Sequence, residues 1–107
     1  MTFRAPGGVK NSYGYHGFSG RKWSDGNWQD YGPTITAGDI VGCGVVGRAC
    51  FFTKNRDFLG VAFRGVPRGL YPTVSFGWGI KGTVEANFGQ SSFRFDLDWE
   101  RVRRLCR

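Results

Sequence analysis

The stretch that decides the fold is residues 69–95, GLYPTVSFGWGIKGTVEANFGQSSFRF, in which apolar and polar residues alternate. Val84 and Phe88 point to one side of an extended chain, and Glu85 and Asn87 point to the other. This period of two is the pattern of a half-buried β-strand. Glycines and a proline interrupt it, which predicts several short strands joined by tight turns.

The pattern of short strands and turns continues towards the N-terminus. Residues 18–38 contain Ser-Gly, Asp-Gly, Tyr-Gly-Pro and Ala-Gly-Asp, so we expect a long loop region there, and long loops often bind ligands. Further strands are predicted at 12–17, with Tyr13 and Tyr15 on one face, at 39–46, at 49–54, and over 59–63, where Leu59, Val61 and Phe63 alternate.

Gly47-Arg48 separates two of these strands and suits a type II′ hairpin turn, which requires glycine at its first central position. With that turn Val45 faces Cys50 and Cys43 faces Phe52, and all four side chains share one face. The two cysteines are then diagonal neighbours. We therefore expect buried free thiols rather than a disulfide.

The C-terminal end has helical periodicity. Asp96 or Asp98 is expected to cap a helix over 99–106. Trp99, Val102 and Cys106 share one apolar face of this helix. The domain boundaries that follow are a flexible lead-in over 1–10, one folded domain over 11–97, and a short basic helix or tail over 98–107.

Composition fits one small, basic, all-β domain. The 107 residues include 18 glycines, and aromatic residues make up 17%, which is typical of strands with tight turns and an aromatic core. Fifteen Lys and Arg residues stand against 8 acidic ones, and they are spread along the chain. A surface of this kind favours acidic partners, and it leaves nucleic acid as an open alternative.

Three cysteines without a Cys-x-x-Cys pair argue against a disulfide framework and against a zinc site, so no metal or other cofactor is expected. The first ten residues, MTFRAPGGVK, lack the apolar segment of a secretory signal. We expect a reducing compartment, either the cytoplasm or the nucleus, and no membrane span.

Nothing in the sequence predicts catalysis. His16 is the sole histidine, and no Gly-x-Ser-x-Gly nucleophile motif is present. Asp25 and Asp30 resemble a carboxylate pair only by spacing, and in a glycine-rich segment they are expected to make turn hydrogen bonds. We predict that the protein is not an enzyme.

A set of ordered motifs resembles the SPRY domain family, and within it the Ran-binding-protein-M type. The motifs are Tyr13-Gly14-Tyr15-His16-Gly17, Tyr31-Gly32-Pro33-Thr34, Gly38-Asp39-Ile40-Val41-Gly42-Cys43-Gly44, Phe51-Phe52-Thr53-Lys54-Asn55, Leu70-Tyr71-Pro72-Thr73-Val74 and Glu85-Ala86-Asn87-Phe88-Gly89-Gln90. The resemblance implies an all-β, antiparallel, concanavalin-like sandwich. It also implies a non-enzymatic module that binds a short peptide segment of a partner protein, as scaffold or substrate receptor of a CTLH/GID ubiquitin ligase.

The chain departs from the family pattern in two places. Pro6-Gly7-Gly8 stands where the family has early strands, so the resemblance implies a truncated sandwich whose open sheet edge allows self-association. Arg56 follows Asn55 where the family usually has glycine, so we expect an altered turn there, because Asn-Gly is the strong type I′ signal.

The resemblance also implies the site. Residues 74–79 are similar to a Val-Ser-x-x-Trp-Gly stretch that contacts peptide in the SOCS-box SPRY proteins, and Trp23 occupies the place of a contacting tyrosine. Aromatic and arginine side chains are enriched at binding hot spots. The expected peptide-binding residues are Arg21, Trp23, Trp28, Tyr31, Ser75, Trp78 and Gly79.

Three alternatives stay open. Similar domains occur as secreted effectors that target host proteins. A β-sandwich that binds carbohydrate on its tryptophans, or nucleic acid on its positive surface, has the same architecture. Nucleic acid is the less favoured of these, because the arginines do not cluster with the aromatic residues.

Overall fold

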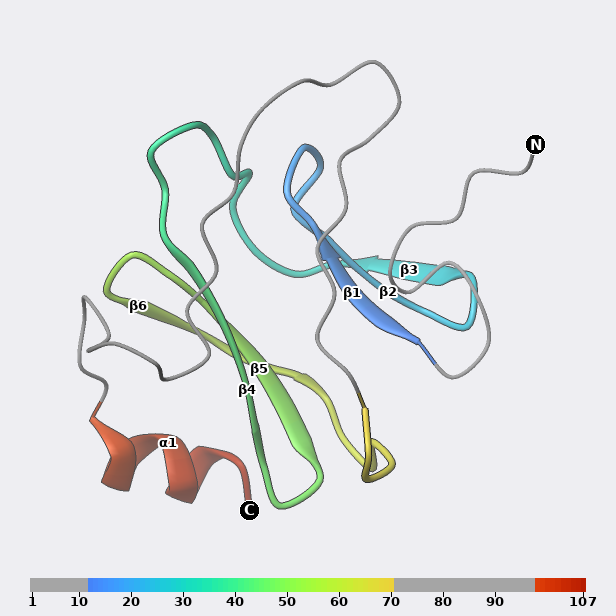
Figure 1. Ribbon diagram of the computed structural model, residues 1–107, viewed down its shortest axis with the longest axis vertical. Coiled ribbons are helices and arrows are strands. Elements are labelled where there is room, and N and C mark those ends of the chain that lie inside the picture. The colour runs from blue at the N-terminus through green and yellow to red at the C-terminus, as the bar shows by residue number, and fades with distance from the viewer. Residues whose placement is uncertain (1–11, 71–97) are drawn as a thin grey trace.

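The computed structural model of this protein describes residues 12–70 and 98–107 (Figure 1). Three of the expected site residues, Ser75, Trp78 and Gly79, lie outside the described residues. So do the strands that the sequence predicts within 71–97.

The described part contains two three-stranded antiparallel sheets and one short helix, which confirms the predicted all-β antiparallel class (Figure 1). The first sheet has the order β1-β2-β3 and the second the order β4-β5-β6. Their bounds are β1 Tyr13–His16, β2 Arg21–Ser24, β3 Asn27–Asp30, β4 Val41–Val46, β5 Ala49–Lys54 and β6 Asp57–Phe63, and the helix is α1 Trp99–Leu105.

The expectation of a long loop region over 18–38 is wrong for residues 21–30. Strands β2 and β3 form a hairpin there, closed by the pair Ser24 and Asn27. The two turn residues between them, Asp25 and Gly26, have φ values of 51° and 81°. Positive φ at both central positions is the requirement of a type I′ turn, and Asp-Gly is one of its preferred sequences. The local turn chemistry therefore forms strands where we predicted a loop.

The β4–β5 hairpin has the predicted register. Val45 lies opposite Cys50 and Cys43 lies opposite Phe52. Gly47 has a φ of 61°, as the first central residue of a type II′ turn requires. One part of the expectation is wrong, because Cys43 is exposed on β4 while Cys50 is buried on β5. Val45, which shares this face of β4 with Cys43, is exposed as well.

Strand β6 does not follow the simple alternation that its sequence predicts. Leu59 and Phe63 pack against the cluster that faces the first sheet, whereas Val61 packs against the cluster on the opposite face. The register between β5 and β6 shifts on either side of Phe51. Gly60 lies in this segment with a φ of 98°, a conformation that glycine adopts at low cost. The bulge redirects the side chains along β6.

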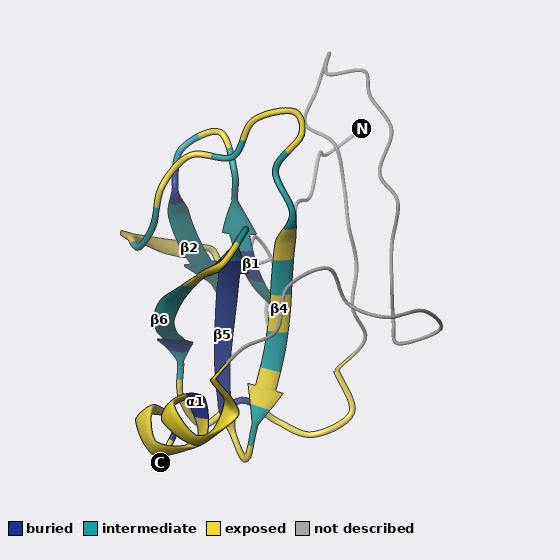
Figure 2. Ribbon diagram, turned by 90° about the vertical axis from the view of Figure 1, so that its left-hand side faces the viewer, coloured by how far each residue is buried: buried dark blue, intermediate teal, exposed yellow. Residues whose placement is uncertain are grey.

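Strand β5 is the centre of the core and is buried on both faces (Figure 2). Cys50 and Phe52 face the first sheet, together with Ala62 and Val66. On the opposite face Ala49 and Phe51 pack against the buried helix residues Val102 and Cys106. The core is thus two clusters that share one strand.

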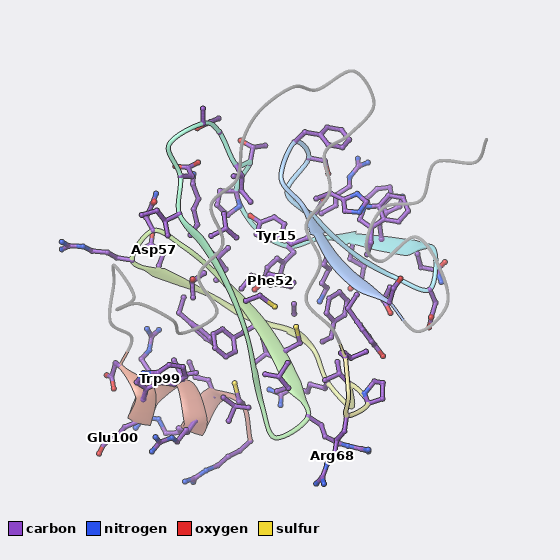
Figure 3. The ribbon with its side chains drawn as sticks, in the orientation of Figure 1. Tyr15, Phe52, Asp57, Arg68, Trp99 and Glu100 are labelled. Carbon is purple, nitrogen blue, oxygen red and sulfur yellow. The ribbon has the colours of Figure 1, made fainter. Side chains whose placement is uncertain are left out.

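Aromatic contacts join the two sheets. Tyr15 of β1 meets Phe52 of β5 at a ring-centroid separation of 5.4 Å and a steep angle of 76° (Figure 3). Tyr13 makes a similar edge contact with Phe63 at 5.0 Å. Both tyrosines lie on one face of β1, as the sequence predicts, and edge-to-face pairs of this kind stabilise a core beyond their buried area.

Candidate functional site

The outer face of the first sheet carries a group of polar and aromatic side chains. Residues that are cross-strand neighbours share a face, so the register puts His16 of β1, Arg21 and Trp23 of β2, and Trp28 and Asp30 of β3 on the same side. Tyr13 and Tyr15 lie on the other side, in the core. We call Arg21, Trp23, Trp28 and His16 the aromatic face.

Two stacked pairs organise the aromatic face. The His16 imidazole lies parallel to the Trp23 indole, with ring centroids 4.9 Å apart and an interplanar angle of 16°. The Arg21 guanidinium carbon lies 3.6 Å from the centre of the Trp28 ring. A cation this close to an indole face is held by the ring's quadrupole, so the arginine and Trp28 form one planar surface.

The two tryptophans differ in their availability to a partner. Trp28 is 47% exposed. Trp23 is half-buried, and its indole N–H is buried with no hydrogen-bond acceptor among the described residues. Trp28 with Arg21 is therefore the more accessible of the two stacked pairs. The Arg21–Asp30 pair, at 3.8 Å between Nε and Oδ1, is exposed and contributes little to stability.

Tyr31 is separate from Arg21, Trp23 and Trp28, because it packs into the core cluster that lies between the two sheets. Its hydroxyl donates to the Gly60 carbonyl at 2.6 Å and accepts from the Phe52 amide at 3.3 Å. Burial raises the pKa of Tyr31 to about 12, since the charged phenolate loses its hydration. The structure thus brings together Arg21, Trp23 and Trp28, but not Tyr31.

Neither His16 nor Lys22 is among the expected peptide-binding residues. The Lys22 ammonium donates to the Ala62 carbonyl of β6 at 2.8 Å and so crosses from one sheet to the other. For Lys22 the signal was the Asp-Gly turn at 25–26, since the hairpin that this turn defines puts Lys22 on the inner side. The pairing of His16 with Arg21 belongs to the β1–β2 ladder, whose register that turn does not set.

Metal-ligating side chains do not gather in the described part of the chain. No group of three His, Cys, Asp or Glu side chains lies close enough to hold a metal ion within 12–70 and 98–107. All three cysteines are free thiols. A hydrogen bond from the Cys50 thiol lowers the pKa of Cys43, and the same bond together with burial raises the pKa of Cys50. No helix of the described part is long and apolar enough to cross a membrane.

Similar proteins share this stretch of sequence. The chain is 55% identical to a Drosophila melanogaster protein named Ran-binding proteins 9/10 homolog, over 87% of the chain and 10% of that protein. It is 50% identical to human Ran-binding protein 9, over 89% of the chain and 13% of that protein. A Dictyostelium discoideum protein named dual specificity protein kinase splA is 42% identical over 70% of the chain, which is 3% of its own length.

The chain thus spans a small fraction of the length of these relatives, and the shared part occurs in proteins with different names. The chain is therefore similar to one module within each of these proteins and not to the whole proteins. The family model of the SPRY domain matches residues 2–91. The chain therefore belongs to the SPRY domain family of protein-interaction modules.

Proposed function

We propose that this domain is a non-enzymatic module that binds a short peptide segment of a partner protein, and that Arg21 and Trp28 make the central contact. The observation that carries the proposal is the exposed Arg21–Trp28 stack on the aromatic face. Arginine and tryptophan are the residue types that dominate binding hot spots. A rigid aromatic on a sheet loses little conformational entropy when a ligand covers it.

The arrangement of the sheet supports this role. The contact residues come from β2 and β3, in a sheet whose inner side is fixed to the core by Lys22 of β2 and Tyr13 of β1. Trp23 is stacked on His16 beneath the contact surface. Side chains supported in this way are preorganised, which reduces the free energy spent on ordering when the partner binds.

The first test is alanine substitution with a matched control. Trp28→Ala is expected to weaken partner binding by about 2 kcal/mol or more, and Trp78→Ala should act similarly if the expected contact stretch takes part. Arg101→Ala, at an exposed position on α1, should leave binding unchanged. Binding is measured by titration calorimetry with a peptide identified by pull-down, and each variant is checked by thermal melting.

Equal losses from Trp28→Ala and Arg101→Ala would contradict the proposal, as would unchanged binding by a folded Trp28→Ala variant. A salt titration separates peptide from nucleic acid, because binding to phosphates weakens steeply with salt. Peptide binding anchored by aromatic residues should respond much less.

At the level of assembly we propose the scaffold or substrate-receptor role in a ubiquitin ligase that the Ran-binding-protein-M resemblance implies, acting in the cytoplasm or nucleus. The free thiols support a reducing compartment. Tagged chain recovered from cells should bring ligase subunits with it. Recovery of partners without any ligase subunit would leave peptide binding in place and remove this role.

A further inference from the structure

A second surface of the same hairpin lies opposite the aromatic face. A pocket of about 410 Å³ opens between β3 and the end of β6. Six residues that matter for its chemistry line it, namely Lys22, Asn27, Trp28, Gln29, Phe63 and Arg64. Strand alternation puts Lys22, Asn27 and Gln29 together on the inner side of the hairpin, and Trp28 of the aromatic face lines the pocket as well.

The charge of the pocket is positive. Lys22 and Arg64 line it, and neither forms an ion pair with any acidic side chain of the described residues. The Lys22 ammonium has three N–H donors, of which the Ala62 carbonyl takes one. The Arg64 guanidinium donates to the backbone oxygens of Leu105 and Arg107, and among the described residues no Asp or Glu side chain pairs with it. Asn27 and Gln29 add neutral donors beside these two cations.

The backbone beside the pocket is a strand edge. Strand β3 is the last strand of its sheet within the described part of the chain (Figure 1). Ser24 and Asn27 close a two-residue turn, so they form a hydrogen-bonded pair, and the pairs alternate from there. The N–H and C=O groups of Trp28 and Asp30 therefore point away from β2 and outward from the edge.

These observations fit one kind of ligand. We propose that an extended acidic segment of the partner protein pairs with the outer edge of β3, with one Asp or Glu side chain in the pocket beside Lys22 and Arg64. Side chains of an added strand alternate between its two faces. The carboxylate therefore enters the pocket while its neighbours in the peptide lie against Trp28 and Arg21 on the aromatic face. This inference rests on the proposed peptide-binding function and assigns that function a peptide class and geometry.

The probe for the test is a displayed library of short random peptides selected on the folded chain. Selected sequences are then made as fluorescently labelled peptides for anisotropy titrations. We expect acidic residues to recur at one position, with apolar residues at the positions directly before and after it. Peptides selected without any acidic preference would overturn the proposal.

The matched variants change charge at the pocket without touching the Lys22–Ala62 contact. Gln29→Glu should weaken binding of an acidic peptide about tenfold or more, and Gln29→Lys should not weaken it. Replacing the peptide's Glu by Gln should abolish the difference between wild type and Gln29→Glu. Lys22→Gln should also weaken binding, and if that variant does not fold, the Gln29 pair still decides the outcome.

Pairing of the peptide with the edge of β3 can be tested separately, with N-methylated peptides. A methyl group on a peptide nitrogen removes one hydrogen-bond donor, so N-methylation at alternate residues of the peptide should abolish binding and at the intervening residues should be tolerated. Tolerance at every position would overturn the pairing with β3. Equal competition by a single-stranded oligonucleotide would identify a general polyanion surface, which also overturns it.

The variants separate this inference from the proposed function. Loss of binding by Trp28→Ala together with full binding by Gln29→Glu would keep peptide recognition on the aromatic face and reject the acidic pocket. If neither substitution changes the affinity for the selected peptides, both proposals fall. Self-association of the chain that disappears on Gln29→Glu would assign the edge to a second copy and reject the acidic partner.

Discussion

At the scale of the single residue, Tyr31 was a candidate for peptide binding, but its side chain stabilises the fold instead. Its hydroxyl bridges the Gly60 carbonyl of β6 and the Phe52 amide of β5. Tyr31→Phe should lower the free energy of unfolding by about 1–3 kcal/mol, because two partly buried groups lose a hydrogen-bond partner. Chemical denaturation at neutral pH measures this loss.

The same residue predicts a dependence on alkaline pH. The folded-state pKa of Tyr31 is raised from 10.0 to about 12, so the folded state binds the phenolic proton more tightly than the unfolded state does. The stabilisation is complete below pH 10 and is lost as the pH rises from 10 towards 12. Tyr31→Phe should therefore show a shallower alkaline decline in stability than wild type. An equally steep decline would contradict this assignment.

Glycine is required at position 44 because the Phe51 ring on β5 leaves no room for a side chain there. A Cβ atom at this position would lie 2.7 Å from Cε1 of Phe51, a ring that is only 2% exposed. Gly44→Ala should destabilise the fold by about 1–3 kcal/mol through overpacking, as measured by denaturant unfolding. In a Phe51→Leu background the same substitution should cost much less, since the colliding ring is absent. An equal loss of stability in both backgrounds would show that the Phe51 ring is not the source of the strain.

At the scale of the element, the hairpins show what the sequence could predict. The β4–β5 register follows from turn type alone, and it was predicted correctly. The β2–β3 hairpin carries an equally strong signal in Asp25-Gly26, but the surrounding glycine-rich segments favoured a loop reading. Because the aromatic face depends on that hairpin register, the Arg21–Trp28 stack was not predicted, although both residues were candidates.

The helix α1 was predicted with its cap. It covers 99–105, and the Asp98 carboxylate accepts from the Arg101 amide at 3.2 Å. A helix this short is marginal on its own, so its cap and its packing through Val102 hold it in place. The sequence did not predict the hydrogen bonds from Arg64 to the last turn, because they join residues far apart in the chain.

Asp98→Ala should reduce the free energy of unfolding by about 1 kcal/mol, because the Arg101 amide loses its acceptor. Asp98→Ser retains a side-chain acceptor and should lose little stability. Hydrogen exchange at the amides of α1 gives a local readout, and protection there should fall in the alanine variant alone. Unchanged exchange in that variant would mean that packing suffices without the cap.

At the scale of the whole molecule, the proposed binding surface and the core lie on opposite sides of the first sheet. The inner side of β1 and β2 meets β5 and β6, while the outer side carries the aromatic face. Periodicity alone predicts strands and their faces. It does not predict which sheet covers which, since that depends on contacts such as Tyr15 with Phe52 (Figure 3). The SPRY resemblance implied the sandwich class, and the geometry of the site comes from the structure.

The exposed edge of the second sheet leads to the last prediction. Val41 and Val45 are 42% and 51% exposed on β4, and no strand of the described residues pairs with its outer side. Between Val41 and Val46 the strand has neither a charged residue nor a proline, the usual devices that prevent edge pairing. We therefore expect the chain to self-associate through this edge at micromolar concentration.

Val45→Lys puts a charge on that edge and should shift the chain towards the monomer, as measured by sedimentation velocity over a range of concentrations. The substitution is at an exposed position, so it should change stability by no more than about 0.5 kcal/mol. Leu105→Lys is the control, because it adds the same charge to an exposed position on α1 and should leave association unchanged. A wild-type chain that sediments as a monomer at every concentration would show that the β4 edge does not pair between molecules.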